Sequence, residues 1–111
     1  MPVHYSLESI RELIGDDAEM QKELLALFTQ SVVETIEAIH QTQQAEEIKK
    51  AVHKIKPSVQ LMGNQEGFAM AVDLESKIVE SQWVQTEKLN SFCELIATMR
   101  LEILKDFPEL A

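Results

Sequence analysis

Apolar residues recur every three or four positions over most of this chain, a spacing typical of helices that bury one face. No stretch alternates strictly between apolar and polar residues, as a half-buried strand would. The pattern divides into five segments, which predict helices over about 6–14, 16–43, 45–62, 65–81 and 86–106. We therefore expect an all-α protein.

Residues that favour helix ends mark the borders of these segments. Gly15 follows the first segment, and Asp16 with Glu19 matches a capping box that would begin the second. Gly63 and Asn64 separate the third segment from the fourth. Because these connections are short, consecutive helices should run antiparallel. The pattern thus predicts an up-down-up-down four-helix bundle with a short extra N-terminal helix.

Composition and charge narrow the class of protein. Hydrophobic residues make up 45% of the chain and no linker divides it, so residues 1–111 are expected to fold as a single helical bundle domain. The formal net charge of -9 argues against binding to nucleic acid or to an anionic membrane. The single cysteine, Cys93, forms no internal disulfide, and no signal peptide or membrane span is evident. These features favour a cytoplasmic protein.

One basic window stands out in this acidic chain. Lys49, Lys50, Lys54 and Lys56 fall within eight residues that include no acid, and they frame His53. On a helix, His53 lies roughly 140° from the centre of the apolar stripe of its segment and should face solvent. That stripe consists of Ile48, Ala51, Val52, Ile55, Val59 and Met62.

Helix spacing also predicts the neighbours of this histidine. Lys49, Lys56 and Gln60 project within about 60° of His53, since residues three, four and seven apart share a helix face. We therefore expect an exposed imidazole surrounded by cationic and amide donors. Such a surface suits a transferable phosphoryl group.

Glu75 conflicts with the apolar pattern around it. Phe68, Val72 and Val79 surround it on one apolar stripe, where a lone carboxylate is costly to bury. One interpretation is that Glu75 binds the ring nitrogen of His53 that does no chemistry, if the third and fourth helices pack together. The other is that Glu75 lies at the rim of the stripe and reaches water.

Pro57 is the second local conflict, because a proline inside a helix removes a backbone amide and a hydrogen bond. It comes four residues after His53, so the carbonyl of His53 loses its partner. The helix either kinks at Pro57 or ends early and restarts. The apolar stripe continues through Val59 and Met62, which favours a kink.

The same residues resemble a known family, the histidine-containing phosphotransfer (HPt) domains of multistep two-component signalling. That family has the pattern His-x-Leu-Lys-Gly, a glycine ten residues after the histidine, and Leu-Glu or Leu-Gln about twelve residues further. This chain has His53-Lys54-Ile55-Lys56, Gly63 and Leu74-Glu75 at these places. The resemblance covers nearly the whole chain, because Leu-Ile-Gly-Asp-Asp at 13–17 and the long segment after it also fit.

The resemblance implies a role for each matching residue. His53 would accept a phosphoryl group on its outer ring nitrogen, Lys56 would neutralise the phosphoryl oxygens, and Glu75 would hold the other ring nitrogen. Gly63 would provide a small residue where bulk is unwelcome. Pro57 departs from the pattern, because the family usually has glycine directly after the lysine, and this bears on the geometry of partner docking. Docking would also involve Lys49, Gln60 and Gly63.

The resemblance also implies the partners. They would be the receiver domains of response regulators, with a phosphorylatable aspartate and bound magnesium, and an upstream hybrid histidine kinase. The chain has no carboxylate cluster suited to a metal and no glycine loop that would hold ATP phosphates. We therefore expect a monomeric phosphocarrier with no intrinsic metal or cofactor, which is not itself an enzyme and depends on its partners for catalysis.

An alternative function remains open at this point. The same face could belong to a helical adaptor that is never phosphorylated and that binds a receiver or another signalling partner. The variant His53→Gln separates the two functions, because it should abolish transfer by a phosphocarrier and leave binding largely intact in both cases.

Overall fold

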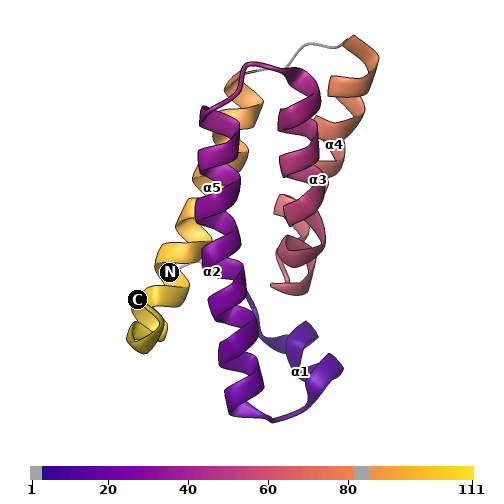
Figure 1. Ribbon diagram of the computed structural model, residues 1–111. Coiled ribbons are helices and arrows are strands. Elements are labelled where there is room, and N and C mark those ends of the chain that lie inside the picture. The colour runs from indigo at the N-terminus through magenta and orange to yellow at the C-terminus, as the bar shows by residue number, and fades with distance from the viewer. Residues whose placement is uncertain (1–3, 82–85) are drawn as a thin grey trace.

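The computed structural model describes residues 4–81 and 86–111, and all regular secondary structure in these ranges is helical, with no strand among them (Figure 1). This confirms the predicted all-α class. The helices are α1 (Glu8–Ile14), α2 (Ala18–His40), α3 (Ala45–Leu61), α4 (Gln65–Ser81), α5 (Thr86–Asp106) and a short 3-10 helix, η1 (Pro108–Leu110).

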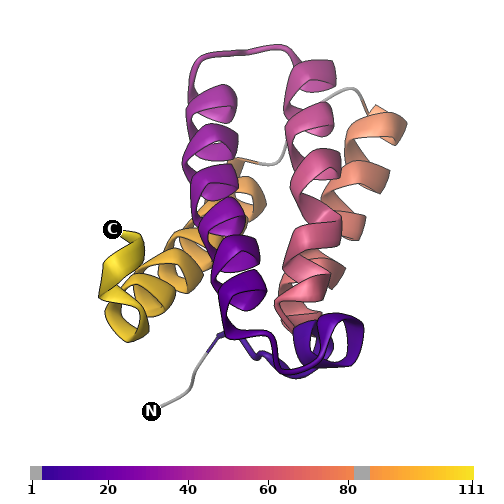
Figure 2. The same cartoon turned by 60° about the horizontal axis from the view of Figure 1, so that its bottom comes forward.

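The four long helices pack against one another around one hydrophobic core. Helix α3 contacts α2 on one side and α4 on the other, and α5 contacts both α2 and α4 (Figures 1 and 2). The short helix α1 packs near the start of α2 and adds Ile10 to the core. Among the described residues, none of the helices combines the length and the apolar character needed to span a bilayer.

The start of α2 corrects one prediction. The helix begins at Ala18, and the side chain of Asp17 accepts a hydrogen bond from the backbone N–H of Met20, with Oδ1 3.1 Å from the nitrogen. Asp17 is therefore the N-cap, and the capping box predicted at Asp16 and Glu19 is wrong. Two acceptable capping residues stand side by side here, and the path of the chain out of α1 decides between them.

Helix α3 runs through Pro57 without interruption, so it neither ends early nor restarts there. Pro57 is exposed, and the missing amide therefore leaves the packed face of the helix intact. The predicted apolar stripe is confirmed, because its residues at 48, 52, 55 and 59 are buried and only Ala51 remains half-buried. Burial of this face directs the opposite face, with His53, toward solvent.

The turn between α3 and α4 is closed by backbone hydrogen bonds of the Schellman type. The N–H of Gly63 donates to the carbonyl of Gln60 over 2.9 Å, and the N–H of Asn64 donates to the carbonyl of Val59 over 3.3 Å. Gly63 adopts a φ of 78°, which side chains with a Cβ rarely adopt. Asn64 then caps α4, since its Oδ1 accepts from the N–H of Gly67 over 2.7 Å.

The N-terminal segment is bound to this turn and to α5. The N–H of Ser6 donates to the carbonyl of Met62 over 2.7 Å, and Nδ2 of Asn64 donates to the carbonyl of His4 over 2.8 Å. The carboxylate of Glu102 accepts from the backbone N–H of His4 over 2.7 Å, and its second oxygen lies 2.6 Å from Nδ1 of the ring. These contacts hold residues 4–6 against the end of the bundle that carries the α3–α4 turn.

We expect Gly63→Ala to lower the free energy of unfolding by about 2 kcal/mol, measured by urea denaturation. The added Cβ would require an unfavourable φ, and it would lie only 2.9 Å from the Cβ of Ser6. In a Ser6→Gly background that second contact is gone, so the same substitution should cost less. Equal losses in both backgrounds would show that the contact with Ser6 has no effect.

Candidate functional site

His53 lies on the exposed face of α3, where 69% of its side chain is accessible to solvent. The predicted exposure is therefore confirmed. Val52 directly precedes His53, and Ile55 follows it by two positions. Both belong to the buried core and hold this part of the helix in place. The imidazole is thus attached to a rigid backbone while its ring remains open to a partner.

Glu75 on α4 binds the ring of His53. The ring nitrogen Nδ1 lies 3.1 Å from Oε2 and 3.2 Å from Oε1 of this carboxylate. An ionised carboxylate only accepts hydrogen bonds, so Nδ1 must carry the proton and donate it. The contact inferred from the sequence is confirmed. In the neutral ring, this tautomer leaves the lone pair on Nε2.

Lys56 binds the same carboxylate. Its Nζ lies 3.1 Å from Oε1 of Glu75, and its side chain is only 21% exposed. Helical spacing predicted Lys56 beside His53, and the family resemblance implied that it would neutralise phosphoryl oxygens. The structure instead places its ammonium group against the carboxylate that holds Nδ1. One carboxylate therefore joins an imidazole and an ammonium group, both from α3.

The position of Glu75 corrects the predicted face of α4. Val72, expected on the buried stripe, is 44% exposed, and Val79 lies outside the residues whose side chains the structure describes. Ala71, Leu74 and Ile78 form the buried face instead. Glu75 lies at the rim of that face, because the hydrophobic core selects a stripe rotated from the predicted one. Its carboxylate is largely covered, and both of its partners come from α3.

The pKa of Glu75 is lowered from its usual value of 4.5. Partial burial acts in the opposite direction and raises the pKa, because it disfavours the charged form. The hydrogen bonds from Lys56 and His53, together with their charges, outweigh this effect. The carboxylate therefore stays ionised to lower pH in the folded chain than in the unfolded chain, and it remains an acceptor for the ring at neutral pH.

This shift predicts a pH dependence of stability. A carboxyl group whose pKa is lowered by folding contributes its full stabilisation above pH 4.5. This contribution to the free energy of unfolding is lost as the pH falls through the lower folded-state pKa. We expect the wild-type chain to exceed Glu75→Gln in free energy of unfolding by about 1 kcal/mol at pH 7, and by less at pH 3. Urea denaturation at both values measures this, with Glu66→Gln on the exposed face of α4 as control. The same difference at both values would contradict the assignment.

A shallow depression adjoins the ring, lined by Glu46, Lys49, Lys50, His53 and Glu75. Lys49 was expected beside the ring from helical spacing, whereas Glu46 was not. Glu46 precedes His53 by seven residues, two helical turns, so the same spacing rule could have found it. The open side of the imidazole therefore faces both cationic and anionic side chains.

The other predicted residues follow His53 along α3 and into the turn after it. Pro57 and Gln60 are exposed on this helix, where a docking partner could reach them. Gly63 follows His53 by ten residues, about 15 Å along a helix axis, and faces Ser6 in the turn. The structure thus gives Gly63 a conformational role and does not bring it to the imidazole.

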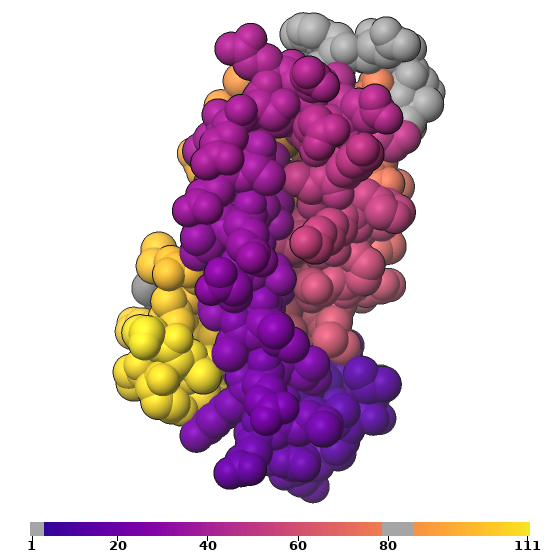
Figure 3. All heavy atoms as spheres, in the orientation of Figure 1, coloured from indigo at the N-terminus to yellow at the C-terminus, as the bar shows by residue number. Residues whose placement is uncertain are grey.

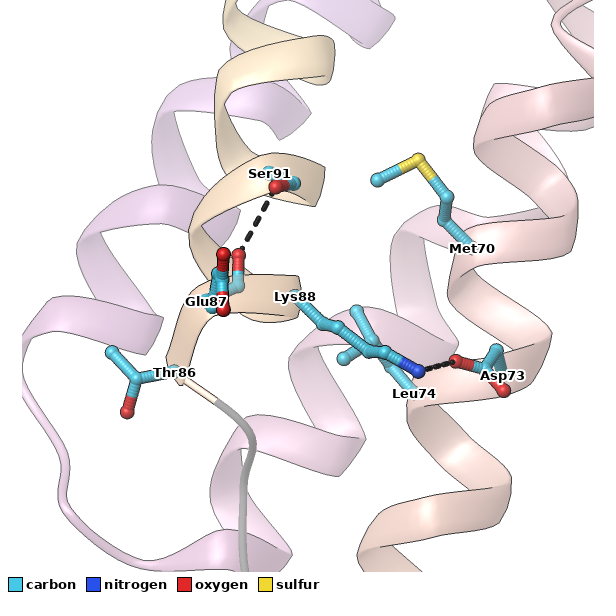
Figure 4. Close-up of a pocket in the computed structure, with 7 residues that line it drawn as sticks. All are labelled: Met70, Asp73, Leu74, Thr86, Glu87, Lys88 and Ser91. Atoms are coloured by element: carbon cyan, nitrogen blue, oxygen red, sulfur yellow. Dashed lines mark hydrogen bonds and ion pairs between the residues drawn. The ribbon is translucent and has the colours of Figure 1, made fainter.

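Two other depressions lie outside this site. A groove between α2 and α3, on the face seen in Figure 3, is lined by small and hydroxyl side chains together with Glu34, Lys54 and Ile55. A larger one between α4 and α5 is bordered by an ion pair, with Nζ of Lys88 3.3 Å from Oδ2 of Asp73 (Figure 4). Ser91, beside it, donates its hydroxyl to the carbonyl of Glu87. Among the lining residues that the structure describes, no nucleophile is paired with a base.

Within residues 4–81 and 86–111, no three His, Cys, Asp or Glu side chains are grouped as a metal ion would require. Comparisons with models of protein families, with curated proteins and with solved structures find no match to this chain. The assignment of function therefore rests on the residues and on their geometry. The distinctive chemical feature is an exposed imidazole whose Nδ1 is held by a carboxylate.

Proposed function

We propose that this chain is a histidine phosphotransfer protein of the HPt type. It accepts a phosphoryl group on Nε2 of His53 from the aspartyl phosphate of a receiver domain and passes it to another receiver. The observation that carries this proposal is the pairing of Nδ1 with Glu75 on an exposed helix face. The proposal includes the up-down-up-down bundle topology of that family, a cytoplasmic location and a monomeric state.

The chemistry of transfer follows from this tautomer. With the proton of Nδ1 bound to Glu75, the lone pair of Nε2 is directed away from the carboxylate and can attack phosphorus. The P–N bond forms as the bond from phosphorus to the aspartyl oxygen breaks, and that electron pair returns to the aspartate carboxylate. The ring, now carrying phosphorus on Nε2 and hydrogen on Nδ1, has a positive charge. Glu75 stabilises this charge at hydrogen-bond distance.

The partners would supply the remaining catalysis. Phosphoryl transfer depends mainly on positioning and on neutralising the phosphoryl oxygens, commonly with magnesium. In this proposal the magnesium ion belongs to the receiver domain, and an upstream hybrid histidine kinase is the original source of the phosphoryl group. The chain itself contributes a nucleophile that is already oriented, on a surface that a receiver can reach.

The direct test is to incubate the purified chain with a receiver domain phosphorylated on its aspartate. We expect label to move to the chain and to be acid-labile and alkali-stable, as a phosphoramidate bond is. A receiver whose phosphorylated aspartate is replaced by asparagine is the control for nonspecific labelling. Receivers that bind the chain without transferring label would contradict the phosphocarrier function and support the adaptor alternative.

A further inference from the structure

Lys49 precedes His53 on α3 and Lys56 follows it, and the structure gives these two lysines different surroundings. We propose that Lys49, and not Lys56, is the residue that contacts the oxygens of the phosphoryl group once it is bound to Nε2 of His53. This inference rests on the proposed function and specifies the phosphoryl-binding part of the same site. Lys56 then acts as a positioning residue, through Glu75.

The contacts of Lys56 place it on the wrong edge of the ring for a phosphoryl group on Nε2. Its Nζ lies 3.1 Å from Oε1 of Glu75, and that same oxygen lies 3.2 Å from Nδ1 of His53. The ammonium group is thus beside the Nδ1 edge, whereas the phosphoryl group would extend from Nε2. Turning Lys56 toward the phosphoryl oxygens would weaken its pairing with a carboxylate whose side chain is only 15% exposed.

Lys49 lies on the other side of the histidine. It precedes His53 by four residues, one helical turn, and side chains on a helix lean toward its N-terminus. We therefore expect the imidazole to be directed toward the helical turn that carries Lys49. The depression beside the ring is lined by Lys49 and not by Lys56, which agrees with this direction.

The charges around this depression also favour Lys49. Glu46 and Glu75 line it, and their carboxylates would repel a phosphoryl dianion unless a cation intervenes. Lys50 also lines it, but its Nζ lies 3.6 Å from Oε1 of Glu47. Lys49 forms no ion pair with any residue that the structure describes, so its ammonium group is available for a charge-assisted hydrogen bond.

The test uses phosphoramidate as the phosphoryl donor, so that no receiver takes part. Its P–N bond breaks, ammonia leaves, and a new P–N bond forms to Nε2 of His53. A ³¹P NMR titration of the phosphorylated chain then measures the pKa of the phosphoryl group. A nearby cation favours the dianion, so Lys49→Gln should raise this pKa by roughly 0.5.

Lys54→Gln is the matched control, because it removes the same charge from the same helix but from a side chain that lines the α2–α3 groove. Lys49→Arg should restore the pKa of the phosphoryl group. The role of Lys49 is overturned if Lys49→Gln matches Lys54→Gln, or if Lys56→Gln raises the pKa more than Lys49→Gln does. A wild-type chain that gives no phosphohistidine signal either with phosphoramidate or after incubation with a phosphorylated receiver domain overturns the phosphocarrier function and this inference together.

Discussion

His53→Gln is expected to abolish phosphorylation of the chain completely. A glutamine amide offers no nitrogen lone pair that can attack phosphorus, and no other histidine among the described residues has Nδ1 held by a carboxylate and an exposed ring. His4 also binds a carboxylate, but its side chain is only 34% exposed and its backbone is tied to Glu102 and Asn64. Transfer from a labelled receiver, followed by gel electrophoresis, measures the effect.

The fold should survive this substitution. The side chain of His53 is 69% exposed, and Lys56 continues to pair with Glu75, so the free energy of unfolding should change by less than about 1 kcal/mol. His40→Gln, which changes an exposed histidine on α2, is the matched control and should be labelled normally. Persistent label on His53→Gln would contradict the assignment of the acceptor. Receiver binding should remain in both variants.

Glu75→Ala is expected to produce the second largest effect, a loss of transfer rate on the order of 10- to 100-fold. Without the carboxylate, the proton of the neutral ring can occupy Nε2 and block the nucleophile, and the positive charge that develops on the ring lacks its counter-ion. Lys56, only 21% exposed, also loses its partner. Rapid-quench measurement of transfer from a phosphorylated receiver would give the rate.

Two variants separate ring positioning from a general loss of structure. Glu75→Gln keeps an oxygen that can accept the proton of Nδ1, so its rate should fall between those of the wild type and Glu75→Ala. Glu66→Ala, at an exposed position of α4, should transfer at the wild-type rate. The ¹⁵N chemical shifts of the imidazole report the tautomer directly. Wild-type shifts and rate in Glu75→Ala would show that the carboxylate does not orient the ring.

The helix pattern was predictable because it depends on local spacing. The segments predicted over about 65–81 and 86–106 agree with α4 and α5, since apolar periodicity, Asn64 and Gly63 act within a few residues. The faces of the helices were less predictable. In α2, for example, the apolar spacing does not distinguish Leu27 from its neighbours, yet Leu27 is 64% exposed while Leu25, Phe28 and Val32 form the core.

For the candidate site, the sequence by itself determined the exposure of His53, and it offered the pairing with Glu75 as one of two interpretations. The first follows from the angle of residue 53 to a strongly apolar stripe, and the second from the need of a carboxylate for a polar partner. The exposure depends on the residues of α3 alone, whereas the pairing also requires that α3 and α4 pack together. The basic window around His53 was also visible in the sequence, because its lysines lie within eight consecutive residues.

Only the tertiary structure decided that Lys56, and not Lys49, pairs with Glu75. Helical spacing places Lys49 and Lys56 equally well beside His53. The direction of a long, flexible side chain, however, depends on where the neighbouring helix presents an opposite charge. Glu75 on α4 provides that charge to Lys56, through a contact of 3.1 Å. The contact of Gly63 with Ser6 depends in the same way on residues far apart in sequence, which meet only when the helices pack.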